Sequence, residues 1–301
     1  MPLTPEQQAE IDSQRATPRQ TLRAVSEGME NHLYVAHQVL DHGLVRVIDY
    51  MGDDAAICQA ARVIYGKGTK SVQNDEGLIR YLMRHWHSTP FEMCEVKFHV
   101  KLPVFVARQW IRHRTANVNE YSGRYSILDR EFYIPAPEHL AAQSSQNHQG
   151  RGEVLQGAEA QRVLDLLRED AMRSYDSYEA MLSQEGQQGL ARELARMNLP
   201  ANIYTQWYWK VDLHNLLHFL RLRADSHAQY EIRAYADIMC DITRDWVPAA
   251  FGAFQDYRMN AVNLSAQAAD ALRRRLAGEV VTQENAGMGA REWREFQAVW
   301  G

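Results

Sequence analysis

The sequence has little cysteine, no long apolar run and no excess of positive charge. Only three of its 301 residues are cysteine, and Cys58, Cys94 and Cys240 are too few and too scattered for a disulfide framework. No apolar stretch approaches the ~18 residues of a membrane-spanning helix, and the polar N-terminus has no apolar signal-peptide core. We therefore expect a cytoplasmic protein with no membrane partner.

The net charge of −5 at pH 7 argues against general nucleic-acid binding, because proteins that grip a phosphate backbone need a basic surface. Hydrophobic residues make up 46% of the chain and charged residues 24%, which is typical of a soluble globular protein. A chain of 301 residues can bury one full core. We predict a central domain at residues 29–258, with a surface insertion at 138–157, between an N-terminal extension (1–28) and a C-terminal extension (259–301).

Several common ligand-binding motifs are absent as well. No Gly-x-Gly-x-x-Gly follows a strand, and the glycine-rich residues 66–71 lack the spacing of a phosphate-binding loop, so we expect a turn between helices there. His214 and His218 are four residues apart and could face one metal ion, as in a metal-dependent phosphohydrolase. They have no clear third ligand and no His-Glu-x-x-His pattern, so packed histidines or cofactor contacts are the better interpretation, and no metal site is predicted.

Residues 108–125 form a strongly polar stretch between apolar segments, with four arginines, a histidine, amides and hydroxyls. Burying a guanidinium group is costly unless it meets an anion or a fixed acceptor. The planar guanidinium suits phosphates and carboxylates, and it also stacks on aromatic rings. The composition therefore favours a small, anionic, planar ligand such as a nucleotide or a flavin. The alternatives are a solvated basic face and a nucleic-acid-binding surface.

The spacing in this stretch matches a family signature. Arg112-His113-Arg114, seven further residues and Ser122 form the pattern RHR-x7-S, which resembles the signature of flavin-dependent thymidylate synthases. Further blocks at residues 85–92, 196–200 and 222–229 are similar to segments of the same family and follow in the family's order. The resemblance covers roughly residues 53–254.

The resemblance implies an α+β fold, with a mixed sheet flanked by helices, assembled as a homotetramer with active sites shared between subunits. It also implies reductive methylation of dUMP to dTMP, with methylenetetrahydrofolate as carbon donor, NADPH as reductant and FAD as cofactor. A reduced flavin can carry both a hydride and a carbon unit. The three cysteines lie in apolar patterns and are expected to be core residues, so no thiol nucleophile is predicted.

The dUMP site implied by the resemblance is built around arginines. Arg124 and Arg196 are expected near the phosphate. Arg223 is expected to be catalytic, because a fixed cation beside the pyrimidine stabilises negative charge on the ring. The alternative for Arg223 is an ion pair with Asp225 or Glu231. The residues implied to bind dUMP are Gln109, Trp110, Ile111, Arg112, Glu120, Tyr121, Ser122, Gly123, Arg124, Arg196 and Arg223.

The FAD site implied by the resemblance uses arginine and histidine in place of a glycine-rich loop, and His87 is expected to border the flavin ring. Asp212, His214 and His218 stand where some relatives carry Asn, Arg and Asn. Asn117 stands where many carry Ser, so no hydroxyl chemistry is assigned there. The residues implied to bind FAD are His87, Thr89, Arg112, His113, Arg114, Glu120, Asp212, Leu213, His214 and His218.

Periodicity and turn residues predict the secondary structure. Alternation of apolar and polar residues, together with β-favouring side chains, predicts strands at residues 43–51, 93–101, 203–211 and, more briefly, 121–127. Asp53, Asn74 and Asp212 are expected to cap helices, and the last two helices to end near residues 85 and 223. The other helices are expected at residues 103–112, 158–182, 190–197 and 227–246.

Overall fold

The computed structural model describes residues 4–66, 75–145, 150–183 and 186–301. The chain divides into two units, Met1–Met259 and Asn260–Gly301. The predicted cap at Asn74 and most of the glycine-rich residues 66–71 lie outside the described residues. Within the described ranges, no helix combines the length and the apolar character needed to cross a bilayer.

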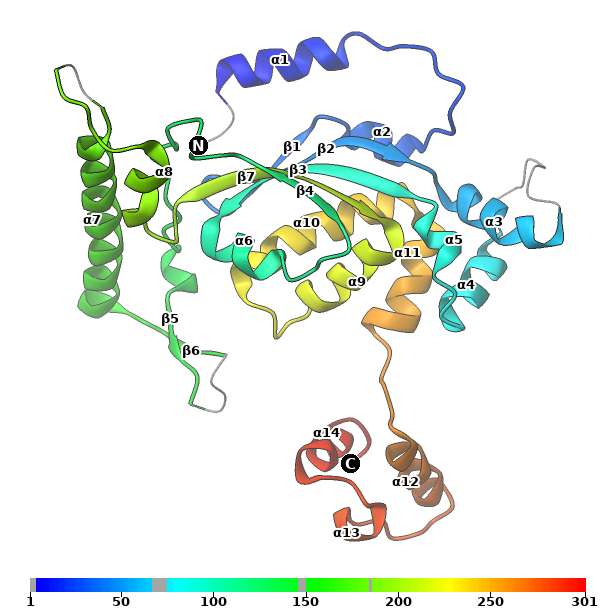
Figure 1. The fold of residues 1–301 in the computed structure, drawn as a ribbon. Helices are drawn as coiled ribbons and strands as arrows, with labels where there is room; N and C mark the ends of the chain where they lie inside the picture. The colour runs from blue at the N-terminus through cyan, green and yellow to red at the C-terminus, as the bar shows by residue number, and fades with distance from the viewer. Residues whose placement is uncertain (1–3, 67–74, 146–149, 184–185) are drawn as a thin grey trace. The chain divides into compact units, whose positions relative to one another are not determined.

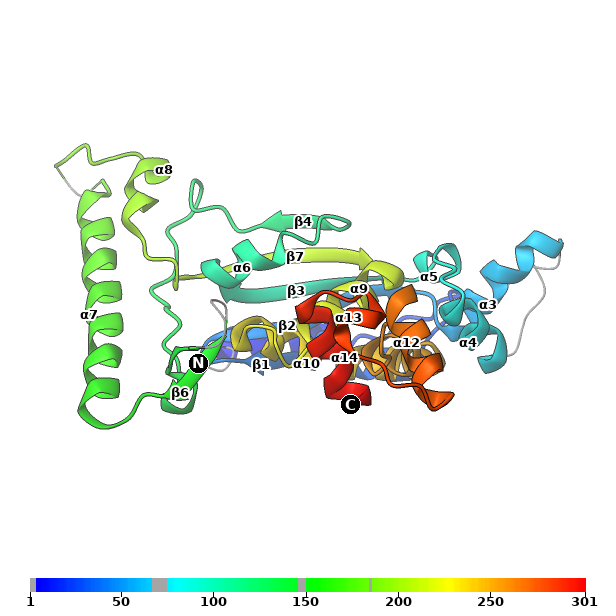
Figure 2. The same ribbon diagram turned by 90° about the horizontal axis from the view of Figure 1, so that it is seen from below.

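A five-stranded sheet forms the centre of the first unit (Figure 1). Every pair of neighbouring strands in it is antiparallel. In Figure 2 the strands follow one another from β4 at the top to β1. Their order across the sheet is β1 (Ala36–Val39), β2 (Gly43–Met51), β3 (Glu95–Pro103), β7 (Tyr204–Asp212) and β4 (Asn117–Glu120).

The predicted α+β class is confirmed, whereas the expectation of a mixed sheet is wrong. The strands predicted at residues 43–51, 93–101 and 203–211 are confirmed as β2, β3 and β7. The pattern of apolar residues that located these strands shows which face is buried, but it carries no information on strand direction. The antiparallel pairing therefore had to come from the structure.

One face of the sheet is apolar, because alternate residues of the central strands point to it. Phe98 of β3 lies opposite Trp209 of β7, and their rings stack with centroids 6.4 Å apart. Three helices pack against this face (Figure 1), namely α6 (Val104–Trp110), α9 (Leu213–Arg223) and α10 (Tyr230–Trp246). The ring of Trp110 reaches both layers, since its centroid lies 5.3 Å from that of Trp209 and 4.6 Å from that of Phe219 on α9.

Aspartate residues cap the N-termini of several helices beside the sheet. The predicted caps at Asp53 and Asp212 are confirmed, because they accept hydrogen bonds from the amides of Ala56 (2.8 Å) and Asn215 (2.9 Å). The cap of α4 is Asp75, which accepts from the Leu78 amide at 3.0 Å. These caps begin α3 (Asp54–Arg62), α4 (Glu76–Arg84) and α9, while α5 (Thr89–Glu92) precedes β3 and α11 (Pro248–Phe254) follows α10.

The strand predicted at residues 121–127 is wrong. β4 ends at Glu120, and the chain then turns so that the amides of Tyr125 and Ser126 donate to the carbonyl oxygen of Ser122, at 3.1 and 3.2 Å. Ser122 and Gly123 favour turns, and here they outweigh the β-propensity of the neighbouring tyrosine residues. β4 is exposed along its whole length, so it lacks the apolar alternation that would reveal a strand in the sequence.

The predicted helices elsewhere are confirmed with small shifts of their ends. They are α6, α7 (Gly157–Met181), α8 (Arg192–Ala195) with the adjoining 3-10 turn η3 (Arg196–Asn198), and α10. Within the predicted surface insertion, β5 (Ala141–Gln143) and β6 (Arg151–Val154) pair in antiparallel fashion.

An ion pair between Arg151 and the buried carboxylate of Glu231 anchors this insertion to the start of α10. Arg151 donates to both carboxylate oxygens of Glu231 at 2.5 Å each, and the Glu231 side chain is only 4% exposed. Tyr133 and Gln229 donate to the same carboxylate at 3.1 and 2.8 Å. Burial alone would raise the pKa of Glu231, but the hydrogen bonds from Arg151 and Gln229 outweigh it and lower the pKa.

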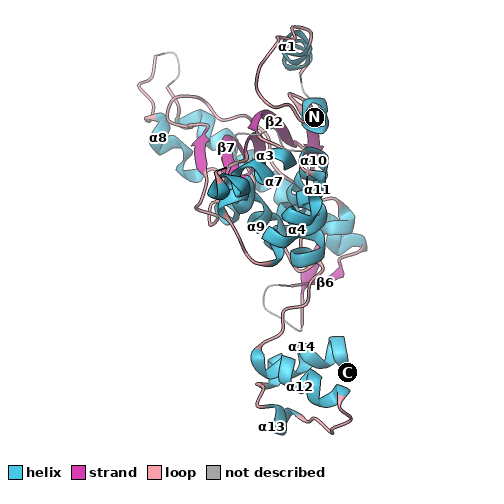
Figure 3. Ribbon diagram, turned by 90° about the vertical axis from the view of Figure 1, so that its right-hand side faces the viewer, coloured by secondary structure: helices cyan, strands magenta, loops and turns pink. Residues whose placement is uncertain are grey.

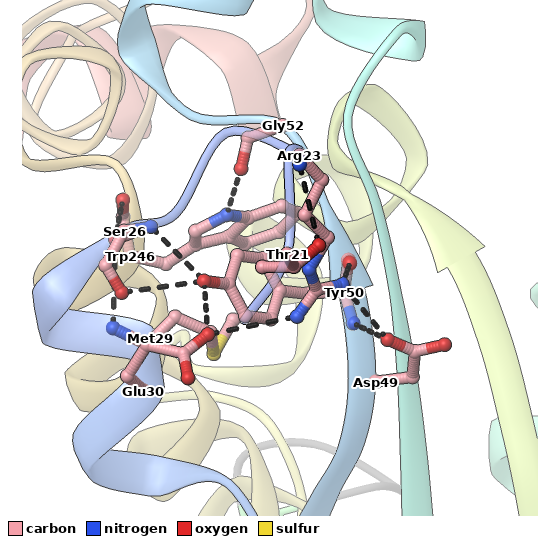
Figure 4. Close-up of polar contacts among 9 residues, drawn as sticks. All are labelled: Thr21, Arg23, Ser26, Met29, Glu30, Asp49, Tyr50, Gly52 and Trp246. Carbon is pink, nitrogen blue, oxygen red and sulfur yellow. Dashed lines mark hydrogen bonds and ion pairs between the residues drawn. The ribbon is translucent and has the colours of Figure 1, made fainter. Parts of the chain in front are cut away.

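Polar contacts attach the N-terminal segment to the sheet and to α10 (Figure 4). Arg23 donates to the carbonyl oxygen of Tyr50 at 2.7 Å and to the Asp49 carboxylate at 3.1 Å. The Ser26 hydroxyl donates to the carbonyl oxygen of Trp246 at 2.9 Å. The helices of this segment are α1 (Pro5–Arg15) and α2 (Glu27–His32).

The second unit contains helices and loops only in its described residues (Figure 3). It has a core of its own, in which the rings of Trp293 and Phe296 stack with centroids 5.6 Å apart. Its helices are α12 (Ala266–Leu276), α13 (Gln283–Ala286) and α14 (Ala290–Trp300).

Replacing Arg151 with Met leaves the buried carboxylate of Glu231 without its cationic partner. We expect the free energy of unfolding to fall by about 2–3 kcal/mol, as measured by urea denaturation. Arg168→Met is the matched control, because Arg168 makes an exposed ion pair with Asp165, and it should cost less than about 1 kcal/mol. Equal losses in the two variants would show that the pair with Glu231 adds no stability.

Candidate active site

The loop after α6, one side of α9 and two residues of β7 line an open cavity of about 340 Å³, which we call the arginine cavity. It brings the signature residues Arg112, His113 and Arg114 together with Arg223, which lies 110 residues after His113. The lining residues are Arg112, His113, Arg114, Thr115, Trp209, Val211, Asn215, His218, Leu222 and Arg223.

A hydrogen bond between two of these residues fixes the guanidinium of Arg223. Its Nε donates to Nε2 of His113 at 3.0 Å. Burial, and then the positive charges of Arg223 and His218, lower the pKa of His113 to about 4. The imidazole is therefore neutral at pH 7 and can accept this bond. Burial also lowers the pKa of Arg223, yet its guanidinium stays charged near neutral pH.

Among the described residues, no Asp or Glu lines the arginine cavity, so none of them places a carboxylate beside its positive charge. Across the described ranges, no ion pair joins Arg112, Arg114 or Arg223 to an acidic residue. Cationic side chains without a protein anion suit an anionic ligand, such as the phosphate groups of a nucleotide or of FAD.

The alternative expected for Arg223, an ion pair with a nearby acidic residue, is wrong. Asp225 pairs with His227 at 2.9 Å, and Glu231 pairs with Arg151 at 2.5 Å. Both carboxylates are thus engaged elsewhere. The positive charge of Arg223 remains directed to the arginine cavity.

A second cavity, of about 60 Å³, shares His218 with the first, and we call it the histidine cavity. His87 and His214 also line it, so the structure gathers the predicted histidines beside the signature residues. No group of three or more His, Cys, Asp or Glu among the described residues is placed to hold a metal ion. The lining residues are Met83, Trp86, His87, Phe91, His214, Leu217, His218, Arg221, Phe254 and Arg258.

Some predicted residues lie behind the cavities. Trp110 and Leu213 have no exposed surface, so their side chains are out of reach of a ligand in this conformation. Asp212 is engaged in capping α9, because its carboxylate accepts from both the amide and the side chain of Asn215, at 2.9 and 2.7 Å. The buried side-chain oxygen of Gln109 has no hydrogen-bond partner among the described residues.

Some of the other residues predicted to bind dUMP lie outside the cavities, in the turn after β4 and on η3. Gly123 and Arg196 are neighbours, since a Cβ atom on Gly123 would lie 3.3 Å from the Arg196 side chain. Arg124 makes an exposed ion pair with Glu193 at 3.0 Å. The predicted residues that line neither cavity are Thr89, Gln109, Trp110, Ile111, Glu120, Tyr121, Ser122, Gly123, Arg124, Arg196, Asp212 and Leu213.

The residues that line the histidine cavity without having been predicted from the sequence include Trp86, Arg221 and Arg258. Trp86 stands between His85 and His87 in a block that resembles the family, so its position could have indicated it. Arg258 lies beyond the end of the resemblance, and no pattern in the sequence marks it.

All three cysteines are buried, which confirms the prediction that they are core residues. Burial raises the pKa of Cys94 and of Cys240 to about 12, and it raises the pKa of Cys58. A buried thiol with a raised pKa is protonated at pH 7 and is a poor nucleophile.

NMR titration should show His113 changing protonation near pH 4. The unfolded chain takes up this proton near pH 6.5, so between these values the folded chain loses stability through His113 as the pH falls. In Arg223→Met the pKa of His113 should rise but stay below 6.5, because burial, the larger cause, remains. The His113→Asn variant identifies the resonance. A His113 that titrates at 6.5 in both proteins would contradict the neutral acceptor.

Comparison with known proteins identifies the family. The family model described as thymidylate synthase complementing protein matches residues 46–249. A flavin-dependent thymidylate synthase from Ruegeria pomeroyi is 79% identical over 301 residues and covers 100% of both chains. Another from Gluconobacter oxydans is 64% identical over 299 residues, which cover 99% of this chain and 98% of that protein.

Solved structures agree with the sequence comparisons. A crystal structure of the UMP/dUMP methylase PolB from Streptomyces cacaoi, bound with 5-Br dUMP, is 29% identical with a TM-score of 0.66. The match covers 74% of this chain and 99% of that one. With a family model that spans most of the first unit and relatives that match along the whole chain, the protein belongs to the flavin-dependent thymidylate synthase family.

Proposed function

We propose that this chain converts dUMP to dTMP, adding to C5 of the uracil a one-carbon unit from methylenetetrahydrofolate, with NADPH as the reductant. As a member of its family, the chain is an enzyme, a methyltransferase that depends on a flavin. The observation that carries the proposal is the arginine cavity, where Arg112, Arg114 and Arg223 meet no carboxylate among the lining residues. Phosphate groups and an ionised uracil ring are anions of the kind that such a cavity stabilises.

The residues present fit FAD as the cofactor. Arg112 and Arg114 offer guanidinium groups for the pyrophosphate, and His87, His214 and His218 offer ring nitrogens on the adjoining histidine cavity. In the part of the chain that the structure describes, no Asp or Glu lines either cavity to repel the phosphates. When bound, the flavin supplies the hydride and can carry the carbon unit. The chain itself holds the two ring compounds and keeps their surroundings cationic.

Arg223 is the residue proposed to be catalytic. His113 fixes its Nε at 3.0 Å, and its terminal NH₂ groups make no hydrogen bond among the described residues. A fixed cation beside the pyrimidine stabilises the negative charge left when N3 loses its proton, and it makes C5 a better carbon nucleophile. Because the acceptor on His113 is neutral, it does not cancel the field of the guanidinium at the ring.

A homotetramer with shared active sites remains part of the proposal. It is supported by the separation of the predicted dUMP residues into two groups, since Ser122, Gly123, Arg124 and Arg196 line neither cavity. A neighbouring subunit that brings this second group to an arginine cavity would complete a phosphate site. Arg124 would then exchange its exposed ion pair with Glu193 for the phosphate. The cytoplasmic location likewise stays a prediction.

The test is to purify the protein and supply dUMP, methylenetetrahydrofolate and NADPH. We expect a yellow protein with bound FAD and the formation of dTMP, followed by tritium release from C5 of labelled dUMP. A metal-dependent phosphohydrolase would instead lose activity with a chelator, and a nucleic-acid-binding module would show salt-sensitive binding without a chromophore. A folded protein that is colourless and binds neither FAD nor dUMP contradicts the proposal.

Arg223→Ala should lower kcat for dTMP formation by at least about 10²–10³-fold, because the charge that stabilises the ionised ring is lost. FAD should stay bound, since Arg112 and Arg114 are unchanged. Flavin absorbance and tritium release measure the two effects. Arg244→Ala is the matched control, because Arg244 makes an exposed ion pair with Asp241 and should leave turnover unchanged. Full turnover in the Arg223 variant would remove that residue from the catalytic role.

Replacing Cys58, Cys94 and Cys240 with Ala, one at a time and together, should leave dTMP formation intact. Each replacement should cost about 1 kcal/mol of stability, because each removes a buried sulfur atom from the core. Thermal unfolding and tritium release separate the two effects. A variant that stays folded and binds FAD but forms no dTMP would show that a thiol takes part in the reaction.

A further inference from the structure

Trp86 directly follows His85, the C-cap residue of α4, and has a backbone conformation that favours glycine, with a φ angle of 63°. Its amide donates to the carbonyl oxygen of Met83 at 3.3 Å, and the amide of His87 donates to that of Leu82 at 3.0 Å. These two bonds follow the C-cap residue His85 and form the Schellman pattern of a helix end. Glycine is the usual residue at the left-handed position of this pattern.

A bulky side chain at a left-handed position strains the backbone. Such strain persists only where surrounding contacts hold the residue, and it is concentrated at ligand-binding and active sites. The stability of α4 does not account for the tryptophan, because glycine would end the helix without the strain. The reason for a tryptophan at this position must therefore lie in the contacts of its indole ring.

Arg258 holds one face of the indole. Its Cζ lies 3.5 Å from the centroid of the Trp86 ring, and its guanidinium donates to the carbonyl oxygens of Met83 and, at 2.9 Å, of Tyr257. Arg258 belongs to the π-helical turn η4 (Gln255–Met259). Single π-helical turns are rare in proteins, and those that do occur are often found at functional sites.

The same turn is also attached to α4 through Arg80. This arginine donates to the carboxylate of Asp256 and to the hydroxyl of Tyr257, the latter at 3.2 Å. Its Cζ lies 4.9 Å from the centroid of the Tyr257 ring. Two arginines therefore connect α4 and its end to η4. The stack of Arg258 on Trp86 is part of this fixed arrangement.

The other face of the indole is open. Trp86 keeps 64% of its surface exposed, although an indole gains free energy when it is buried. It lines the histidine cavity with His87 and His218, and within the described ranges no Asp or Glu lines this cavity. An open flat ring beside a cationic cavity suits a second flat ring that carries phosphate groups.

We infer that the open face of Trp86 is a stacking platform for the planar redox ring of a phosphate-bearing cofactor, with Arg258 holding the indole from behind. Two rings in the proposed reaction have this chemistry, the isoalloxazine of FAD and the nicotinamide of NADPH. The inference rests on the proposed function, which supplies both rings. Stacking on an aromatic side chain strengthens binding by roughly tenfold or more.

Titrations of flavin-free protein with FAD, and of FAD-loaded protein with NADP⁺ and dUMP, test the platform. Trp86→Ala and Trp86→Gly should each raise the Kd of FAD or of NADP⁺ by about tenfold or more, while the Kd of dUMP stays within about twofold. Trp86→Phe keeps a flat ring and should stay within about threefold. Trp300→Ala, which removes an exposed tryptophan from the second unit, is the matched control. If the Kd of FAD rises, the ring that stacks on Trp86 is the isoalloxazine; if the Kd of NADP⁺ rises, it is the nicotinamide.

Thermal unfolding separates the platform from a structural role. Trp86→Gly should keep Tm unchanged or raise it by about 2–4 °C, because glycine relieves the backbone strain. A large fall in Tm would overturn the explanation from strain. Unchanged Kd values for both FAD and NADP⁺ would overturn the platform, as would a loss confined to dUMP. If the wild-type chain binds neither FAD nor dUMP, the proposed function fails, whereas equal binding by wild type and variants removes the platform alone.

Discussion

The site depends on a hydrogen bond that fixes a cation without neutralising it. A carboxylate partner for Arg223 would lower the cost of burying the guanidinium, but it would also cancel the charge that a ligand needs. His113 avoids this, because burial and two neighbouring positive charges hold its pKa at about 4 and leave a neutral acceptor at pH 7. The free protein therefore bears a desolvation cost that an anionic ligand offsets. Ligand binding should accordingly stabilise the fold.

The aromatic core explains how two distant segments meet at this cation. Trp110 at the end of α6 packs against Trp209 of β7 and Phe219 of α9, with ring centroids 5.3 and 4.6 Å apart. The signature residues begin two positions after Trp110, the last residue of α6, and α9 starts directly after β7. The burial of Trp110 thus has a positional role, since it sets where Arg112–Arg114 emerge relative to α9.

The sequence could predict the elements whose pattern is local. The alternation in β3 and the carboxylate caps at Asp53 and Asp212 each reflect contacts within a few residues, and the structure confirms them. The direction of each strand and the existence of the exposed strand β4 depend on pairing with strands far along the chain. Local sequence patterns therefore could not predict them. The family signature located the site, but it did not show which side chains are exposed there. Trp110 and Arg112 are only two positions apart, yet Trp110 is fully buried and Arg112 is exposed.

At Trp86 the preference of a helix end for glycine conflicts with the tertiary contacts of the indole ring, and this conflict points to a function. Glycine is the residue that usually occupies this position at a helix end. The partner that holds the ring, Arg258, comes from a π-helical turn 172 positions later, at the end of the first unit. A strained residue that is held by a distant cation and still left open to solvent adds little to folding. Its open ring lies beside His87 at a cavity without carboxylates, so the strain is best explained by what that ring contacts when the cavity is filled.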